Sequence, residues 1–266
     1  MTGDPTHHVP ALAIDGLGVA FGGVRAVDDV SFTVPAGTVT AIIGPNGAGK
    51  TTLFNLVTHL LTASAGTVRY FGQPIDHLSP DRIAAIGLIR AFQSARIFPG
   101  MTVLENAMVG AHRLIPGSVL GQFLWSPASR RNERLLRARA EALLDIAGLT
   151  TQRDDPAHLL PMGGQKLLEI VRALMAAPRL LLLDEPAAGL NDTETAELSA
   201  MLRAVREGGI TLLLVEHNMS LVMDVADQVV VLDAGRVVAV GSPAEIQANA
   251  AVIEAYVGRL EDAGHA

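Results

Sequence analysis

The stretch that decides the fold of this chain reads Gly44-Pro45-Asn46-Gly47-Ala48-Gly49-Lys50-Thr51-Thr52. It fits the pattern Gly-x-x-x-x-Gly-Lys-Thr, and it lies between an apolar run at residues 39–43 and a helical pattern at residues 53–60. A glycine-rich turn of this kind exposes successive backbone N–H groups beside the positive end of a helix dipole. We therefore expect the stretch to cradle the phosphates of a nucleotide, with Lys50 reaching the β- and γ-phosphates and the Thr51 hydroxyl binding magnesium.

Length and composition limit the class of protein. The chain has 266 residues, a formal net charge of −7 and no cysteine. This length allows one or two domains, the acidic balance argues against a sequence-independent nucleic-acid binder, and the lack of thiols excludes disulfides. The mean hydropathy is +0.35, yet no apolar run approaches the ~20 residues needed to cross a bilayer. Residues 1–10 are polar, and we expect them to form a flexible tail without the apolar core of a signal peptide.

Short apolar runs in the last third of the chain predict an α/β fold. Residues 180–183 and 211–215 are apolar without alternation, which is typical of strands buried on both faces of a parallel sheet. Helical patterns at residues 193–206 and 219–225 and an apolar run at residues 229–232 continue the alternation of strand and helix. That alternation predicts a parallel sheet with crossover helices.

The rest of the chain departs from this alternation. Its front part has short strand-like runs at residues 12–14, 19–21, 30–34 and 66–71, separated by glycine-rich turns, which favours antiparallel pairing. The middle, from about residue 94 to residue 177, has almost no strand signal. Its clearest helix covers residues 129–147, with one apolar face made of Leu136, Ala140, Leu143, Leu144 and Ala147. We therefore expect a nucleotide-binding core that is interrupted by a helical insertion.

A second motif supplies acidic groups for phosphate chemistry. The apolar run at residues 180–183 delivers Asp184 and Glu185 at the carboxyl end of a strand, which is where open α/β sheets bind ligands. Asp184 can hold magnesium directly or through water, and Glu185 can polarise an attacking water. An acidic turn is common at strand ends, so this motif gains its meaning from the phosphate-binding loop.

Three single residues converge on the same chemistry. Gln93 follows an apolar run at residues 87–91 and can sense magnesium and the attacking water. His217 follows the run 211–216 and can contact the γ-phosphate, although an isolated histidine there is more often a partly exposed polar residue. Phe21 can stack on an adenine ring, although a lone aromatic more often belongs to the core.

The order and spacing of these motifs resemble the ATPase subunit of ABC transporters over essentially the whole chain. The resemblance implies ATP hydrolysis with ATP and Mg²⁺ as cofactors. By position it makes Lys50, Gln93, Glu185 and His217 catalytic, and Thr51, Gln93 and Asp184 metal ligands. It places the remaining roles as follows: the Walker A loop at residues 44–52, the Walker B strand at residues 180–184, the adenine-stacking aromatic at Phe21 and the D-loop at residues 188–191.

A narrower resemblance is to the importers of branched-chain amino acids. It rests on the stretches Arg90-Ala91-Phe92-Gln93, Met101-Thr102-Val103-Leu104-Glu105-Asn106, Asp184-Glu185-Pro186-Ala187-Ala188-Gly189-Leu190-Asn191, Glu216-His217-Asn218-Met219 and Ala255-Tyr256-Val257-Gly258. It implies a peripheral subunit on the cytoplasmic face of the inner membrane, bound to permease subunits and served indirectly by a substrate-binding protein, with no nucleic-acid partner. Importers of urea or short amides, exporters of lipopolysaccharide or lipid, and soluble ABC ATPases remain as alternatives. A P-loop kinase leaves Gln93, Gly163 and His217 without explanation.

One family motif is degenerate in this chain. The ABC signature usually reads Leu-Ser-Gly-Gly-Gln, and the aligned stretch is Leu160-Pro161-Met162-Gly163-Gly164. Gly163 keeps the position whose N–H faces a γ-phosphate, but Pro161 lacks both a hydroxyl and an N–H. Because the family sandwiches each ATP between one chain's Walker motifs and the other chain's signature, we expect a heterodimer with a second ABC ATPase, a homodimer being the alternative. A register shifted by one residue puts Met162 at the serine position, and the hydroxyl is still absent.

The resemblance implies an α/β fold: a P-loop NTPase (RecA-like) core with an antiparallel β subdomain and an inserted helical subdomain. We expect a core formed by residues 11–93 and 178–258, and a helical subdomain at residues 94–177. Residues 1–10 and 259–266 are expected to be tails.

Overall fold

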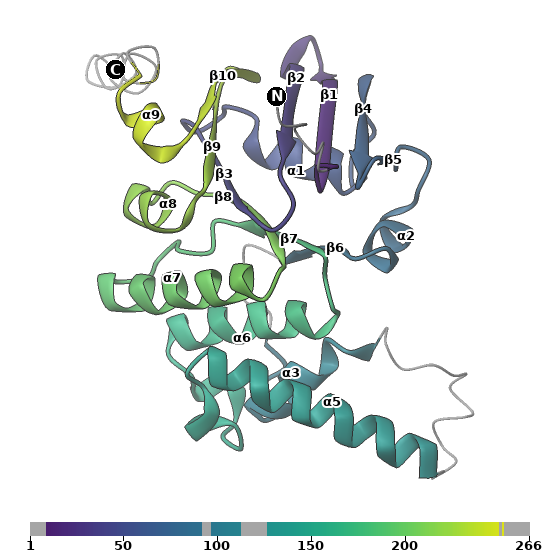
Figure 1. The fold of residues 1–266 in the computed structure, drawn as a ribbon, viewed down its shortest axis with the longest axis vertical. Coiled ribbons are helices and arrows are strands. Elements are labelled where there is room, and N and C mark those ends of the chain that lie inside the picture. Colours follow the sequence, from purple (N-terminus) through teal and green to yellow (C-terminus); the bar gives the residue numbers. More distant parts are fainter. Residues whose placement is uncertain (1–8, 92–96, 113–126, 250–251, 253–266) are drawn as a thin grey trace, which may run out of the picture.

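The computed structural model of the chain describes residues 9–91, 97–112, 127–249 and 252 (Figure 1). Within these ranges, none of the helices combines the length and the apolar character that crossing a membrane would require. Two sheets occupy the upper part of the view, and a group of helices lies below them.

A six-stranded sheet forms the centre of the molecule. Its strand order is β10-β9-β3-β8-β7-β6, and all neighbouring pairs are parallel except β9 with β10. The strands are β3 (Val39–Ile43), β6 (Leu88–Ala91), β7 (Leu180–Asp184), β8 (Thr211–Val215), β9 (Gln228–Asp233) and β10 (Arg236–Gly241). Every residue of β3, β7 and β8 is buried, which confirms the prediction of strands covered on both faces.

The two faces of this sheet contact different cores. Side chains alternate across a strand, so Leu181 and Leu183 of β7 pack against the helical part, whereas Leu180 and Leu182 pack on the opposite face. That opposite face is covered by α1 (Lys50–Val57) and by the smaller sheet. The sheet therefore lies between two packed layers, which fix the position of its carboxyl edge.

The smaller sheet is antiparallel, with the order β2-β1-β4-β5. It consists of β1 (Leu12–Phe21), β2 (Val24–Val34), β4 (Ala65–Tyr70) and β5 (Gln73–Pro74). The expected strands at residues 12–14 and 19–21 are one continuous strand, so their separation in our prediction was wrong. Register shifts in the middle of β1 accommodate Gly16, whose backbone comes so close to β4 that a Cβ on Gly66 would lie 2.4 Å from the Gly16 carbonyl oxygen.

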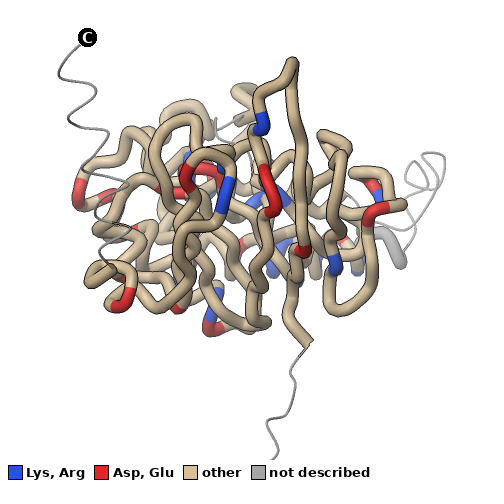
Figure 2. Tube along the Cα trace, turned by 90° about the horizontal axis from the view of Figure 1, so that it is seen from above, with Lys and Arg blue, Asp and Glu red and all other residues tan. Residues whose placement is uncertain are grey.

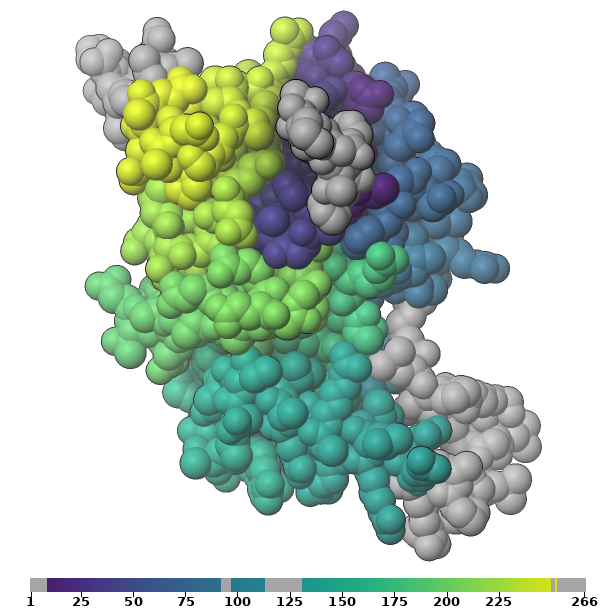
Figure 3. Space-filling model, viewed as in Figure 1, coloured from purple at the N-terminus to yellow at the C-terminus, as the bar shows by residue number. Residues whose placement is uncertain are grey.

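Helices α3 (Val103–Val109), α5 (Pro127–Ile146) and α6 (Met162–Met175) pack together below the large sheet (Figures 1 and 3). The short 3-10 turns η2 (Thr150–Gln152) and η3 (Ala157–Leu159) connect α5 to α6. The prediction of a helix at residues 129–147 is confirmed within two residues at each end, and its apolar side buries Ala140 and Leu144 completely. Helix α6 contacts α3 and α5, and it also contacts α7 (Asp192–Glu207) and β6, so it joins the helical part to the sheet.

The remaining described helices pack around the large sheet, and two of them contribute to the core on the face that the helical part covers. They are α2 (Pro80–Ala85), α7 (Asp192–Glu207), α8 (Met219–Val225) and α9 (Pro243–Gln247). Viewed from above, basic and acidic residues are interspersed and neither sign fills this side of the molecule (Figure 2).

Candidate nucleotide-binding site

The phosphate-binding loop is wedged between two backbones that leave no room for side chains. A Cβ on Gly44 would lie 2.1 Å from the carbonyl oxygen of Leu232 in β9, and a Cβ on Gly49 would lie 2.3 Å from that of Ala26 in β2. Gly49 also has a φ of 98°, a left-handed conformation that glycine adopts without strain. These two glycines allow the chain to turn sharply from β3 into α1, which begins at Lys50.

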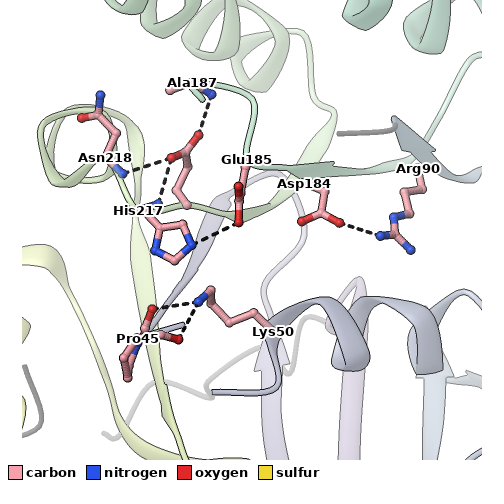
Figure 4. A network of polar contacts seen from close by, with 10 residues as sticks. Pro45, Lys50, Arg90, Asp184, Glu185, Ala187, His217 and Asn218 are labelled. Carbon is pink, nitrogen blue, oxygen red and sulfur yellow. Dashed lines mark hydrogen bonds and ion pairs between the residues drawn. The ribbon is translucent and has the colours of Figure 1, made fainter. Parts of the chain in front are cut away.

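Lys50 lies buried at the start of α1, with 6% of its surface exposed. Its Nζ donates hydrogen bonds to the carbonyl oxygens of Gly44 (2.8 Å) and Pro45 (2.9 Å), so the lysine folds back over its own loop (Figure 4). Burial lowers the pKa of Lys50 below its usual value, and the charges of Glu185 and Asp184 oppose part of that shift. A phosphate placed in the loop would replace these carbonyl partners with a charged acceptor.

Asp184 ends β7 and is held by one oxygen only. Its Oδ2 accepts a hydrogen bond from Arg90 of β6 at 2.5 Å, while its buried Oδ1 has no hydrogen-bond partner among the residues that the structure describes. Arg90 also donates to Asn55 Oδ1 of α1 at 2.6 Å and lies over the ring of Phe54. The buried Oδ1 of Asp184 and the Thr51 hydroxyl group of α1 are both oxygen donors, which is the ligand type that suits Mg²⁺. The residues present therefore fit the expected metal.

Glu185 and His217 follow the ends of the neighbouring strands β7 and β8, and the two side chains meet. His217 Nε2 lies 3.1 Å from Glu185 Oε1 (Figure 4). Glu185 has a φ of 51°, which is unusual for a residue with a side chain and often marks a functional turn.

A pocket of about 210 Å³ joins these groups. Glu185 and His217 line it on one side, and the loop and first turn of α1 line it on the other: Asn46, Gly47, Ala48, Gly49, Lys50, Thr51 and Thr52, together with Ala26 of β2. The structure therefore brings the phosphate-binding loop, the acidic strand end and the histidine to one place, as expected for ligands of an open α/β sheet.

Among the expected site residues that the structure describes, five do not line this pocket: Phe21, Gly44, Pro45, Gly163 and Asp184. Phe21 ends β1 and is 48% exposed, and its adenine contact remains a prediction. Gln93 lies outside the described residues. Gly163 opens α6, where its N–H donates to Glu194 Oε1 at 3.1 Å, while Pro161 occupies the N-cap without any side-chain bond.

Sequence reasoning missed four residues that support the site. These side chains bind Asp184, Gly163 or the turn after Glu185, and no local sequence pattern indicates those contacts. They belong to Arg90, Lys166, Glu194 and Glu216. One signal was available: the chain has only two lysines, Lys50 and Lys166, and both lie here.

Comparisons with known proteins agree with this geometry. The family model described as "ABC transporter" matches residues 27–188, and that described as "Branched-chain amino acid ATP-binding cassette transporter" matches residues 236–261. A high-affinity branched-chain amino acid transport ATP-binding protein of Pseudomonas aeruginosa, BraF, is 42% identical over 94% of this chain and 98% of its own length. The corresponding protein of Salmonella typhimurium, LivG, is 40% identical over the same shares.

A solved structure has the same fold. The ADP conformation of an ATP-binding cassette of an ABC transporter superposes with a TM-score of 0.81 and 32% identity, over 94% of this chain and 99% of that one. The first family model covers more than half of the chain, and the relatives cover nearly all of it. The chain therefore belongs to the ABC transporter family and is one of its nucleotide-binding ATPases.

Proposed function

We propose that this chain hydrolyses ATP to drive an importer of branched-chain amino acids, as its relatives BraF and LivG are named for. The observation that carries the chemistry is the pocket in which Lys50, Glu185 and His217 face one another. The substrate class rests on the relatives alone, because an ATPase subunit of this kind does not touch the transported solute.

The pocket can position ATP for attack by water. Lys50 and the N–H groups of residues 46–51 would bind the β- and γ-phosphates, which replaces the carbonyl contacts that Lys50 makes now. Thr51 and the orphaned Oδ1 of Asp184 would hold magnesium, which neutralises phosphate charge when it is bound. Glu185 would orient the water that attacks the γ-phosphorus and draw its proton away as the bond to the ADP oxygen breaks. His217, held beside Glu185, and Gln93 would contact the γ-phosphate.

The working unit we propose is a heterodimer with a second ABC ATPase. Pro161 removes two hydrogen-bond donors from the signature, and the remaining N–H of Gly163 is bound by the carboxylate of Glu194. A γ-phosphate from the partner's site would have to displace that carboxylate, so this signature is a poor partner for ATP. A second subunit with an intact signature would complete the site that Lys50 and Glu185 form.

The membrane partner that we propose is a pair of permease subunits, approached from the cytoplasmic face. A mostly apolar groove of about 450 Å³ runs between α2 and β6 on one side and α3 and α6 on the other. It includes Leu60 and Phe98, which are 55% and 44% exposed. This groove separates the proposed core (residues 11–93 and 178–258) from the proposed helical subdomain (residues 94–177), so a helix seated in it would sense their relative motion.

The test is transport by the assembled complex. The chain is expressed with the permease subunits and the second ATPase subunit of a branched-chain amino acid importer and reconstituted in liposomes with the substrate-binding protein and labelled leucine. We expect leucine uptake that needs ATP and is abolished by Lys50→Ala. Uptake of urea in place of leucine, or export of lipid, would overturn the proposed substrate. ATP hydrolysis without any permease requirement would overturn the transport role.

A further inference from the structure

The turn that follows Glu185 is held by two side chains from distant parts of the chain. The backbone of this turn is strained at Glu185, where φ is 51°. A strained conformation persists only where its surroundings fix it, and here the fixing groups can be identified. The turn's own backbone supplies two bonds, from Glu185 N–H to Val215 (2.9 Å) and from Ala188 N–H to Glu185 (3.1 Å).

Glu216 is the first of the two side chains. It follows β8 and is buried, with 2% of its surface exposed. Its Oε1 accepts the N–H of Ala187 at 2.7 Å, and its Oε2 accepts the N–H groups of His217 (2.9 Å) and Asn218 (3.1 Å). In Figure 4, the dashed lines that start at the backbone N–H groups of Ala187, His217 and Asn218 lead to this one carboxylate. It therefore ties the turn that carries Glu185 to the turn that carries His217.

Lys166 is the second side chain that holds the turn after Glu185. It comes from α6, and its Nζ donates to the carbonyl oxygens of Pro186 (3.0 Å) and Ala188. The amide of Ala187 is thus bound by a carboxylate, and the carbonyls on either side of it are bound by an ammonium group. Burial lowers the pKa of Lys166 below its usual value, and four acidic residues oppose that shift, Glu216 the most. The cation and the buried carboxylate stabilise each other's charge.

We propose that Glu216 and Lys166 are positioning residues for ATP hydrolysis: together they hold the Pro186–Ala188 turn so that Glu185 faces His217 across the pocket. Neither lines the pocket of the phosphate-binding loop. The inference rests on the proposed role of Glu185, and it adds that α6, whose first turn is the signature, is connected directly to the turn behind that residue.

The geometry singles out one isosteric variant. Both oxygens of Glu216 accept from backbone N–H groups, so Glu216→Gln must point its NH₂ group at one of those donors and leave it unpaired. In the assembled transporter we expect kcat to fall on the order of 10- to 100-fold while KM for ATP changes by less than about 3-fold, because the phosphate-binding loop is untouched. Glu105→Gln, in the capping box of α3, serves as the control and should leave both constants unchanged. An unchanged kcat in Glu216→Gln would overturn the proposal.

Substitutions of Lys166 test the same proposal independently. Lys166→Met keeps the aliphatic stem but loses the donors, and should lower kcat in the same way; Lys166→Arg should restore at least part of it. In a Glu185→Gln background, neither Glu216→Gln nor Lys166→Met should lower the residual rate of ATP hydrolysis further, because all three substitutions act through the carboxylate of Glu185. Additive losses would show that the two residues act elsewhere.

Hydrogen exchange on the full chain keeps the proposal testable if a variant fails to assemble. In Glu216→Gln we expect faster exchange of the Ala187 amide, with the protection of α1 unchanged. Unchanged protection at Ala187 would contradict the assigned bond. If instead Glu185→Gln hydrolyses ATP normally, the proposed function of Glu185 fails, and that result is separate from the outcome of the exchange experiment.

Discussion

Arg90 shows at the scale of a single residue how this site combines stability with chemistry. Its guanidinium group binds Asp184, Asn55 and the face of Phe54, and so connects β6, β7 and α1. Its side chain is 11% exposed and that of Asp184 only 2%, so both charges are largely removed from water. A buried pair of this kind is costly to break from one side.

We predict that Arg90→Met lowers the free energy of unfolding by about 3–5 kcal/mol, because it leaves the carboxylate of Asp184 buried without a cation. Urea denaturation measures this. Arg179→Met, which removes an exposed arginine stacked on Phe71, should cost less than about 1 kcal/mol. Arg90→Met combined with Asp184→Asn should recover much of the loss. Equal losses for Arg90→Met and Arg179→Met would contradict this account of the pair.

The candidate site could be predicted only in part, and residues show why. Lys50, Glu185 and His217 stand beside recognisable local patterns, and the structure brings them together. Glu216 reads in the sequence as the last residue of a strand, and Lys166 as one position in a helix. Their roles arise from bonds between segments that are 20 or more residues apart, which no local pattern encodes.

At the scale of elements, the burial of a strand determined whether its sequence pattern could be recognised. Strands β3, β7 and β8 are buried on both faces and gave continuous apolar runs. Strand β10 alternates exposed and half-buried residues at the sheet edge, so it lacks a continuous apolar run and was not predicted. Helix α3 was not predicted either. The beginning of α3 is fixed by a capping box between Thr102 and Glu105, a signal that was present but not used.

An ion pair joins the two sheets and should make their contact depend on pH. Asp28 of β2 binds Arg236 of β10 at 2.6 Å and Arg25 at 2.8 Å. The hydrogen bond from Arg236, and secondly that from Arg25, lower the pKa of Asp28 below its usual 3.8. A lowered folded-state pKa stabilises the fold above pH 3.8, and this contribution is lost as the pH falls through the folded-state pKa.

We therefore predict that Arg236→Gln lowers Tm by about 1–3 °C at pH 7. The difference from the unmodified chain should shrink as the pH falls below 4 and also at high salt. Calorimetry across this pH range measures it, with Arg69→Gln on the exposed side of β4 as the control. A difference that grows on acidification would show that the pair does not stabilise the contact.

At the scale of the whole molecule, we propose that the signature and the Walker site serve different partners. In this proposal Pro161 and Glu194 weaken the signature, because Pro161 offers no donor and Glu194 accepts the N–H of Gly163, whereas the pocket around Lys50 also contains Glu185 and His217. The chain alone should therefore close poorly around ATP.

We predict that Glu185→Gln with MgATP stays monomeric at micromolar concentration without its partner, and dimerises when the partner ATPase is added. Adding Pro161→Ser should shift the isolated chain toward a homodimer by on the order of 10-fold in Kd. Light scattering after gel filtration measures the species. A stable homodimer of Glu185→Gln that is indifferent to Pro161→Ser would favour the homodimer instead.

The most direct measurement compares ATP binding with a single turnover in the assembled complex. In Glu185→Gln we expect the Kd for MgATP to stay within about 3-fold of the unmodified chain, while the single-turnover rate falls at least ~100-fold, because the phosphate-binding loop is intact and the water is no longer oriented. Lys50→Ala should instead lose binding. Hydrolysis by Glu185→Gln at the unmodified rate would contradict the claim that Glu185 and Lys50 act on one γ-phosphate.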